Sequence, residues 1–395
     1  MNRDENWLMA RKNRYHGLQP LRNALHSVGD PHMAMPFVHV CGTNGKGSTS
    51  FFLMNILMAN GLKCGLFTSP HLVTHRDRMR IGETIIPRED FTRLLEQTGD
   101  LIEKHDLGMF EADVLIALLW FREMKCDIAV IEAGLGGRLD NTNVIQDPLL
   151  SIITTVGLDH MNVLGERIQQ IAFEKAGIIR NNGRVLVGNV DHCAKAVVFR
   201  HAWRKHAQCI QAMPYRDLGE NLFAFDHDVY RVQGALYQKQ NASLALQGAK
   251  LLGVDIHGDA THIALGKAKW AGRFEKVAEN PDIYLDGAHN PEGVAALCRT
   301  LDTLDNPCVV FGALRDKPGR AMAQMLADHC AELIVTGFEA ERADVPMDLM
   351  VKGARLVPDC LEAVRVASQR HRCVVACGSL YLVSELRYRL MGETN

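Results

Sequence analysis

The fold of this chain is decided by the stretch Phe37-Val-His-Val-Cys41-Gly42-Thr43-Asn44-Gly45-Lys46-Gly47-Ser48-Thr49. An apolar, strand-like run at Phe37–Cys41 passes into a glycine-rich turn, and a helical pattern over Ser48–Asn60 follows. Glycines allow successive backbone N–H groups to turn towards phosphate oxygens, and the amino end of the following helix adds partial positive charge. The stretch therefore predicts a nucleotide phosphate loop, with an ordinary tight turn of an α/β protein as the alternative.

Two side chains of this loop have the chemistry that a nucleotide requires. Lys46 would neutralise the β- and γ-phosphates, and the hydroxyl of Ser48 can reach a magnesium ion. The loop departs from the usual GxxxxGK[ST] pattern, because Lys46 precedes Gly47 instead of following the last glycine. The residues predicted to bind the nucleotide are Thr43, Asn44, Gly45, Lys46, Gly47 and Ser48.

Apolar strand-like runs alternate with longer helical patterns through almost the whole chain, which is typical of α/β proteins with mostly parallel sheets. The expected strands of a first series are Phe37–Cys41, Cys64–Thr68, Ile128–Glu132, Ser151–Val156 and Val185–Gly188, and those of a second are Ile283–Asp286, Cys308–Gly312, Leu333–Thr336 and Cys373–Cys377. The clearest expected helices are Ser48–Asn60, Phe91–His105 and Phe110–Lys125. We therefore predict a P-loop-containing parallel-sheet domain over 1–270 and a smaller doubly wound α/β domain over 271–395. A small antiparallel β excursion is expected at Leu222–Gln233.

The composition limits the class of protein. Among 395 residues, 44 Lys and Arg nearly balance 46 Asp and Glu, giving a net charge of −2. Such a chain has no broad basic field for nucleic acid or an anionic membrane, so an anionic ligand must meet a local site. The longest strictly apolar run, Val114–Phe121, is too short to span a bilayer, and the amino-terminal stretch lacks the apolar core of a signal peptide. The eleven cysteines contain no CxxC pair and mostly lie in apolar runs, which predicts reduced core residues and a cytoplasmic protein.

A carboxylate follows the third expected strand. Glu132 ends the run Ile128–Glu132, and the carboxyl ends of parallel strands are where open α/β sheets bind ligands. Magnesium prefers hard oxygen ligands together with substrate phosphates, so Glu132 is a candidate magnesium ligand. A surface acid at a strand end is the alternative.

Lys175 lies on the apolar stripe of an expected helix. Ile168, Ile171, Ala172 and Lys175 are spaced i, i+3, i+4 and i+7, so they share one face. A lysine buried there would have a lowered pKa and could react with carbon dioxide as a neutral amine. A lysine whose stem covers apolar surface while its ammonium reaches water is the alternative, and periodicity alone does not separate the two.

In the second domain, two polar side chains follow the strand Ile283–Asp286. Asp286 and His289 lie between the strand end and the next helix, which is the usual ligand-binding position in such sheets. Asn290 and Pro291 are explained as a helix N-cap followed by a first-turn proline.

The motifs of this chain, taken in order, resemble those of the folylpolyglutamate synthase and dihydrofolate synthase family of the Mur ligase superfamily. They are the loop Gly42–Ser48, Thr68–Leu72, Glu132–Asn143, Leu158–His160, Glu174–Ile178, Gly272–Glu275 and Asp286–Pro291. The resemblance continues to Gly378–Tyr381 and so covers nearly the whole chain.

The resemblance implies roles for further residues. It assigns Ser69, Glu132 and His160 to magnesium, although a hydrogen-bonded structural histidine is the alternative for His160, because imidazole is a poor magnesium ligand. It implies that Lys175 is carbamylated and helps to organise a second magnesium ion.

The same resemblance places the adenine at Asn241, the ribose at Asp286 and the phosphates at Arg273, for which a solvated linker arginine is the alternative. His289 is expected to join these nucleotide-binding residues, and Lys46, Lys175 and His160 are the expected catalytic residues.

The function expected from the residues and the resemblance is ATP-dependent ligation of L-glutamate to a folate, and also to dihydropteroate, through an acyl phosphate. The cofactors are ATP, two Mg²⁺ ions and the carbamylated Lys175, and the partners are small molecules bound by a monomer, with no nucleic acid and no membrane. Arg78 and Arg80 are candidates to receive the anionic glutamyl tail, with a solvated loop as the alternative. Two other functions remain open: a Mur-type amino-acid ligase with another acceptor, and a nucleotide-binding regulatory module.

Overall fold

The computed structural model describes residues 3–12 and 14–392, which fold into two compact units. The first unit contains the described residues up to Arg216, together with Phe223–Arg231 and Asn241–Ala268. The second contains Asp217–Leu222, Val232–Gln240 and the described residues from Lys269 onwards.

The first unit is built on an eight-stranded sheet in the order β4-β3-β2-β5-β1-β6-β7-β8. Its parallel strands are β1 (Phe37–Cys41), β2 (Cys64–Phe67), β5 (Ile128–Glu132), β6 (Leu150–Ile153), β7 (Arg184–Val187) and β8 (Gln208–Gln211). The edge strands β3 (Met79–Ile81) and β4 (Thr84–Ile85) are antiparallel. The central strands β1, β2, β5 and β6 are buried along their whole length, because helices cover both faces.

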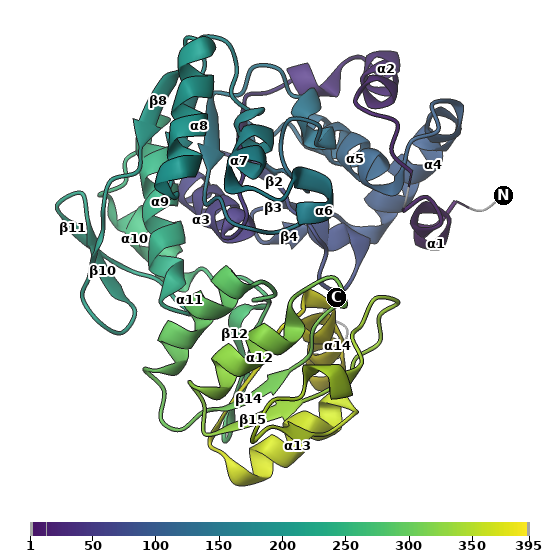
Figure 1. Cartoon of the computed structure of the whole chain (residues 1–395). Helices are drawn as coiled ribbons and strands as arrows, with labels where there is room; N and C mark the ends of the chain where they lie inside the picture. The colour runs from purple at the N-terminus through teal and green to yellow at the C-terminus, as the bar shows by residue number, and fades with distance from the viewer. Residues whose placement is uncertain (1–2, 13, 393–395) are drawn as a thin grey trace. The chain divides into compact units, whose positions relative to one another are not determined.

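Two groups of helices pack on this sheet (Figure 1). One face is covered by α4 (Arg88–Lys104), α5 (Met109–Glu123), α7 (Ile168–Ala176) and α8 (His192–Arg204), and the other by α3 (Lys46–Ala59), α9 (Tyr237–Leu251, from Asn241 onwards) and α10 (Asp259–Lys267). Shorter helices are α1 (Glu5–Met9), α2 (Gln19–Ser27) and α6 (Met161–Leu164). Helix α5 is apolar nearly all round and lies in the largest core, whose members include Phe67 and Ile131.

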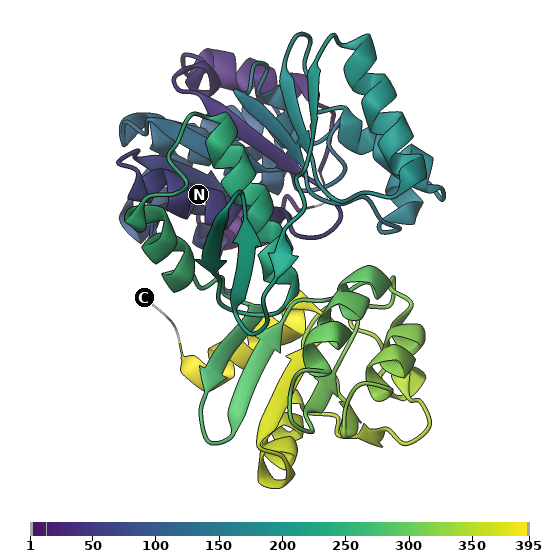
Figure 2. The same cartoon turned by 90° about the vertical axis from the view of Figure 1, so that its left-hand side faces the viewer.

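The second unit has a six-stranded sheet in the order β12-β13-β17-β14-β15-β16. The strands are β12 (Arg273–Ala278), β13 (Asp282–Asp286), β14 (Cys308–Phe311), β15 (Glu332–Val335), β16 (Arg355–Leu356) and β17 (Cys373–Cys377). All neighbours are parallel except β12, which forms an antiparallel hairpin with β13. Helices α11 (Pro291–Leu301) and α12 (Gly319–Ala327) pack on one face. Outside that core, α13 (Cys360–Arg370) contacts β14 and β17, and α14 (Leu380–Met391) contacts β13 and β17 (Figure 2).

The α/β class and most predicted strands are confirmed, with three differences. Helix α3 begins at Lys46 rather than Ser48, because Gly45 adopts a left-handed conformation and caps the helix. The strands β3, β4, β8, β12 and β16 were not predicted, since they are short or irregular and lie towards the edges of their sheets. The β excursion is present as β10 (Leu222–Phe225) and β11 (Asp228–Arg231), which join β9 (Arg216–Asp217) in a small sheet.

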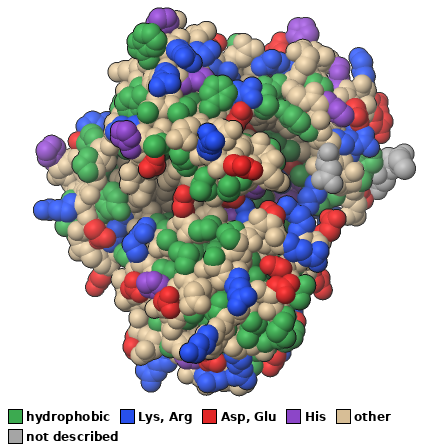
Figure 3. Space-filling view, in the orientation of Figure 1, with side chains coloured by type: hydrophobic (Ala, Val, Ile, Leu, Met, Phe, Trp, Pro, Cys, Tyr) green, Lys and Arg blue, Asp and Glu red, His purple; other side chains and the backbone are tan. Residues whose placement is uncertain are grey.

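The surface and the cysteines agree with the composition. Figure 3 shows acidic and basic side chains mixed over the visible face of each unit. All eleven cysteines are free, and most are buried, as predicted. Among the helices in the described part of the chain, none combines the length and the apolar character needed to cross a membrane.

Candidate active site

The predicted phosphate loop lies between β1 and α3 and is fixed by the chain that follows β6. The carbonyl oxygen of Asn44 accepts hydrogen bonds from the Thr154 hydroxyl (2.7 Å) and the Thr155 hydroxyl (3.2 Å). The Asn44 N–H donates to Thr155 Oγ1 (2.9 Å), and Thr43 Oγ1 accepts from the Gly157 N–H (2.9 Å). These bonds tie the loop backbone to the chain that follows β6.

Two glycines of the loop are in contact with side chains that leave no room for a Cβ atom. A Cβ atom on Gly42 would lie 1.9 Å from Thr154 Oγ1, and one on Gly45, where φ is +82°, would lie 2.3 Å from Asn241 Oδ1. Asn241, predicted to contact adenine, thus lies directly against the loop. The structure brings together all the first-unit residues predicted to bind the nucleotide.

Lys46 and Glu132 meet beside the loop. The Lys46 Nζ atom lies 4.0 Å from Glu132 Oε1 and donates a hydrogen bond to the Thr43 carbonyl oxygen at 3.3 Å. The Ser69 N–H donates to Glu132 Oε2 at 3.2 Å. Strand β5 neighbours β1, which is why its last residue reaches the loop. A nearly buried carboxylate next to a phosphate loop and a serine fits the hard-oxygen preference of Mg²⁺.

The third predicted metal ligand, His160, has a different environment. It begins helix α6 in a left-handed conformation (φ 50°), and its side chain is 44 % exposed. Its Nε2 atom lies 4.0 Å from Oδ2 of Asp159, which is buried. Sequence reasoning missed Asp159, although a carboxylate beside a predicted histidine ligand suits magnesium better than imidazole does.

Lys175 is buried on α7, with 3 % of its surface exposed, which agrees with the buried lysine and not with the alternative of an ammonium that reaches water. Burial and, to a smaller extent, the positive charge of Lys46 lower the pKa of Lys175 to about 8, against the opposing effects of Cys41, Asp159 and Asp140. Within residues 3–12 and 14–392 no group accepts a hydrogen bond from Lys175 Nζ. The site therefore contains an amine that is partly neutral near pH 8.

In the second unit, Asp286 is buried at the carboxyl end of β13. Its Oδ2 accepts a hydrogen bond from the Tyr237 hydroxyl, and its Oδ1 accepts from the Ala288 N–H at 2.9 Å. Burial raises the pKa of Asp286, which the Tyr237 hydrogen bond and the charge of Arg273 oppose. Arg273, the first residue of β12, is paired in register with Asp286, so the two predicted nucleotide-binding residues are neighbours.

Tyr237 was missed because it is separated from Asp286 by 49 residues and follows no motif. Asn290 caps α11 by accepting a hydrogen bond from the Gly293 N–H (2.8 Å), which confirms the capping prediction. The Nδ1 atom of His289 lies 2.8 Å from the carbonyl oxygen of Gly287, which orients its ring at the start of that helix.

Arg78 is a buried residue rather than part of a solvated loop. Its Nε lies 3.2 Å from Oδ2 of Asp113, and its guanidinium stacks on Phe110. His75 Nδ1 lies 3.3 Å from the other oxygen of Asp113. Arg80 is partly buried over the ring of Phe51, so both arginines have packing roles. The charge of Arg78 is already matched by Asp113, which argues against Arg78 as the receptor of an anionic tail.

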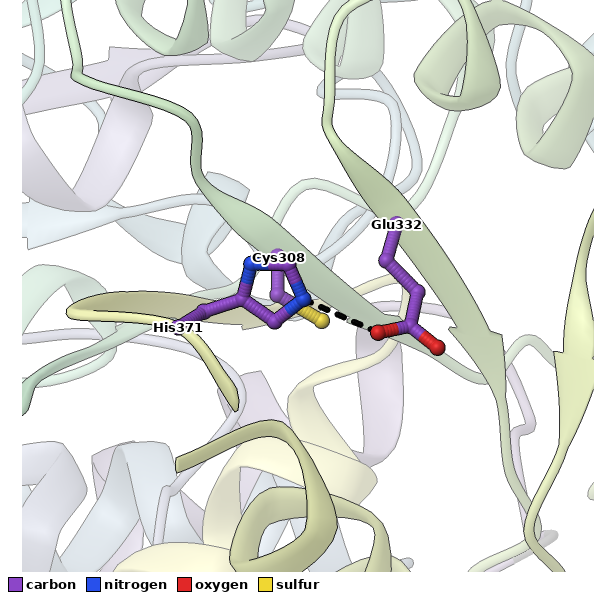
Figure 4. Close-up of side chains that lie close together, drawn as sticks. All are labelled: Cys308, Glu332 and His371. Atoms are coloured by element: carbon purple, nitrogen blue, oxygen red, sulfur yellow. Dashed lines mark hydrogen bonds and ion pairs between the residues drawn. The ribbon is translucent and has the colours of Figure 1, made fainter. Parts of the chain in front are cut away.

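A second group of possible metal ligands, Cys308, Glu332 and His371, lies at the amino ends of β14, β15 and β17 (Figure 4). The Nε2 atom of His371 is 2.9 Å from Glu332 Oε2, and Arg370 Nη1 is 3.2 Å from Glu332 Oε1. Both carboxylate oxygens thus already have cationic or hydrogen-bonding partners, and the group is explained as an ion-pair network.

The fold and the loop define a nucleotide-binding α/β protein with a second, smaller α/β unit. The family model described as Mur ligase, glutamate ligase domain, matches residues 272–380. The chain is 34 % identical over 95 % of its length, and 95 % of the relative's, to the dihydrofolate synthase/folylpolyglutamate synthase of Bacillus subtilis.

Solved structures give the same result. A bifunctional folylpolyglutamate synthase/dihydrofolate synthase with Mn, AMPPNP and L-glutamate bound has a TM-score of 0.86 at 28 % identity, covering 98 % of this chain and 97 % of that one. The E. coli FolC protein in complex with DHPP and ADP has a TM-score of 0.89 at 27 % identity, with the same coverage. The chain belongs to the folylpolyglutamate synthase/dihydrofolate synthase family of Mur ligases, and it is an ATP-dependent ligase.

Proposed function

We propose that this enzyme joins L-glutamate to the carboxylate of folates and of dihydropteroate. The observation that carries the proposal is the phosphate loop, with Lys46 facing Glu132, in a chain of this family. A carboxylate is a poor acyl donor, so it first attacks the γ-phosphorus of ATP and forms an acyl phosphate and ADP. The amine of L-glutamate then attacks the acyl carbon, phosphate leaves and an amide remains.

The loop residues Thr43 to Ser48 are assigned to the phosphates of ATP. Phosphoryl transfer needs mainly positioning and charge neutralisation, and the Lys46 ammonium supplies a positive charge beside the transferring group. Because the loop backbone is already fixed by Thr154 and Thr155, little reorganisation is required when ATP binds.

Ser69, Glu132 and His160 are assigned to a first magnesium ion, which supplies charge neutralisation for the phosphates. Asp159 is added to this set because it is a buried carboxylate next to His160. The neutral amine of Lys175 is assigned to carbamate formation. Its nitrogen bonds to the carbon of CO₂, the electron pair of one C–O π bond moves onto that oxygen to give a carboxylate, and the nitrogen loses a proton. The resulting carboxylate is assigned to a second magnesium ion.

Asn241 is assigned to the adenine, and Arg273, Asp286 and His289 are assigned to the nucleotide as well. Tyr237 is assigned a positioning role, since its hydroxyl hydrogen-bonds to Asp286. The monomeric state and the cytoplasmic location stay predictions.

An assay of ATP-dependent incorporation of labelled glutamate tests the proposal, with dihydropteroate and tetrahydrofolate as parallel acceptors. Incorporation with both acceptors is expected, and product with tetrahydrofolate alone would restrict the enzyme to folylpolyglutamate synthesis. ATP hydrolysis without incorporation would favour a regulatory module, and incorporation only with a peptide-like acceptor would favour another Mur-type ligase.

A further inference from the structure

A cavity of about 530 Å³ lies in the first unit, away from the phosphate loop. Its lining includes Asp147, Arg180 and Lys205, which precede strands β6, β7 and β8 respectively. The phosphate loop instead follows the carboxyl end of β1. Because these strands are parallel, the cavity lies where the strands begin, and the loop lies at the other side of the sheet, where the strands end.

The charged residues that line this cavity are mainly cationic. Arg22, Arg138, Arg180 and Lys205 contribute positive charges, and Asp147 is the one carboxylate among the lining residues. Arg138 is neutralised by Glu174, whose Oε1 lies 2.9 Å from its Nη2. Three cationic groups therefore share a single lining carboxylate, which leaves an excess of positive charge.

The charge of Arg22 acts on Arg180. Burial and the nearby charge of Arg22 lower the pKa of Arg180, and Asp147 opposes them. The Nη2 atom of Arg180 donates to backbone carbonyls, including that of Asn143 at 3.0 Å. The Nε atoms of both Arg22 and Arg180 are shielded from solvent and have no acceptor in the described part of the chain. These Nε atoms do not face the open cavity, but the like charges of the two guanidinium groups are costly, and an anion bound between them would relieve that repulsion.

We propose that this cavity binds a small polyvalent anion, a molecule with two or more carboxylate or phosphate groups. Its volume is in the range of small-molecule sites. Planar guanidinium groups bind carboxylate and phosphate oxygens through paired hydrogen bonds, and Lys205 adds a mobile point charge. The site is separate from the nucleotide site, because it lies at the other edge of the sheet.

Calorimetric titration with citrate and with inorganic tripolyphosphate, without nucleotide or magnesium and at low ionic strength, tests the proposal. The test variant is Arg22→Gln, because Arg22 has no side-chain hydrogen bond or ion pair among the described residues that the change would break. The matched control is Arg204→Gln, which removes an exposed arginine of α8 that does not line the cavity. Lys46→Ala serves as a second control, because it removes the phosphate-loop cation.

Binding by the unchanged enzyme should weaken about tenfold or more in Arg22→Gln, and stay within about twofold in Arg204→Gln and Lys46→Ala. Binding of only one of the two anions would identify its chemical class. The melting temperature of Arg22→Gln without anion should rise, since repulsion from Arg180 is removed. The proposal is overturned if neither anion binds, if Lys46→Ala abolishes binding, if Arg22→Gln binds as the unchanged enzyme does, or if Arg22→Gln melts at a lower temperature.

Discussion

The ammonium nitrogen of Lys46 lies 4.0 Å from the carboxylate oxygen Oε1 of Glu132, at the point where the loop after β1 meets the end of β5. Each side chain thereby partly neutralises the charge of the other. A phosphate group bound beside Lys46 would bring a negative charge, and a cation bound beside Glu132 would bring a positive charge. The pair would therefore suit a metal ion and a phosphate bound together better than an isolated anion.

Lys46→Ala should lower the turnover number by about 100- to 1000-fold, because a charge facing the transferring phosphoryl group is lost. The fold should be retained, since the Lys46 side chain is only loosely hydrogen-bonded to Thr43. Glutamate incorporation and the melting temperature measure the two effects. Lys104→Ala, which removes an exposed lysine at the end of α4, is the control. Turnover close to that of the unchanged enzyme would refute the phosphate-loop assignment.

Lys175→Arg should be as inactive as Lys175→Ala, because arginine keeps a positive charge and cannot form a carbamate. Formate or acetate should partly restore Lys175→Ala by supplying a carboxylate at the vacated position, and should leave Lys175→Arg inactive. Steady-state rates with and without these anions provide the measurement. A fully active Lys175→Arg enzyme would rule out the carbamate.

The free energy of unfolding should depend on Lys175 in alkaline solution. The pKa of Lys175 is about 8 in the folded chain and takes its ordinary value of 10.5 in the unfolded chain. Between these pH values the folded chain holds Lys175 neutral, so unfolding takes up a proton. The contribution of Lys175 to stability should therefore increase as pH rises through this interval, by about 3 kcal/mol in all. Denaturation of the unchanged enzyme and Lys175→Met in CO₂-free buffers, at neutral pH and at about pH 10, measures it. A stability difference that does not change with pH would contradict the lowered pKa.

Arg273→Ala should raise the KM for ATP and slow turnover, with a small loss of thermal stability. Arg273 is half-buried opposite Asp286, so its removal also leaves that buried carboxylate without a nearby cation. Lys276→Ala is the control on the same strand, because Lys276 forms a surface ion pair with Asp282 at 2.9 Å. If Arg273→Ala unfolds readily and keeps its kinetic constants, Arg273 has only a structural role.

Gly45→Ala should weaken ATP binding strongly, because the new Cβ would lie 2.3 Å from Asn241 Oδ1 and the residue has a positive φ. Asn241→Ala removes the obstructing atoms, so Gly45→Ala combined with Asn241→Ala should bind ATP more tightly than additivity of the single changes predicts. Nucleotide titration of the four proteins measures this coupling. Strictly additive losses would place Asn241 away from the loop.

The sequence predicted features that depend on residues close together along the chain. The strand, turn and helix of the phosphate loop, the position of Lys175 on the apolar stripe of α7 and the Asn290 cap follow from spacing and periodicity over a few residues, and the structure agrees with each. Glu132 was placed near the loop because the carboxyl ends of parallel strands share one edge.

The features that were missed depend on partners far apart in sequence. The hydrogen bond of Tyr237 to Asp286, the contact of Arg78 with Asp113 and the pairing of Thr154 with Asn44 join residues 35 to 110 positions apart. Arg22 and Arg180 likewise come from separate helices and loops, and no local pattern marks a cavity between them. Only the packing of the sheet and its helices brings such residues together.

The close approach of Gly42 to Thr154, and of Gly45 to Asn241, has a consequence for the evolution of this sequence. A side chain at position 42 would displace the hydroxyl that bonds to Asn44, and one at position 45 would displace the Asn241 amide. Neither glycine can be exchanged singly without loss of the loop conformation. In descendants of this chain, the two glycines and their two partners should be passed on together, as a unit of four positions drawn from three separate segments.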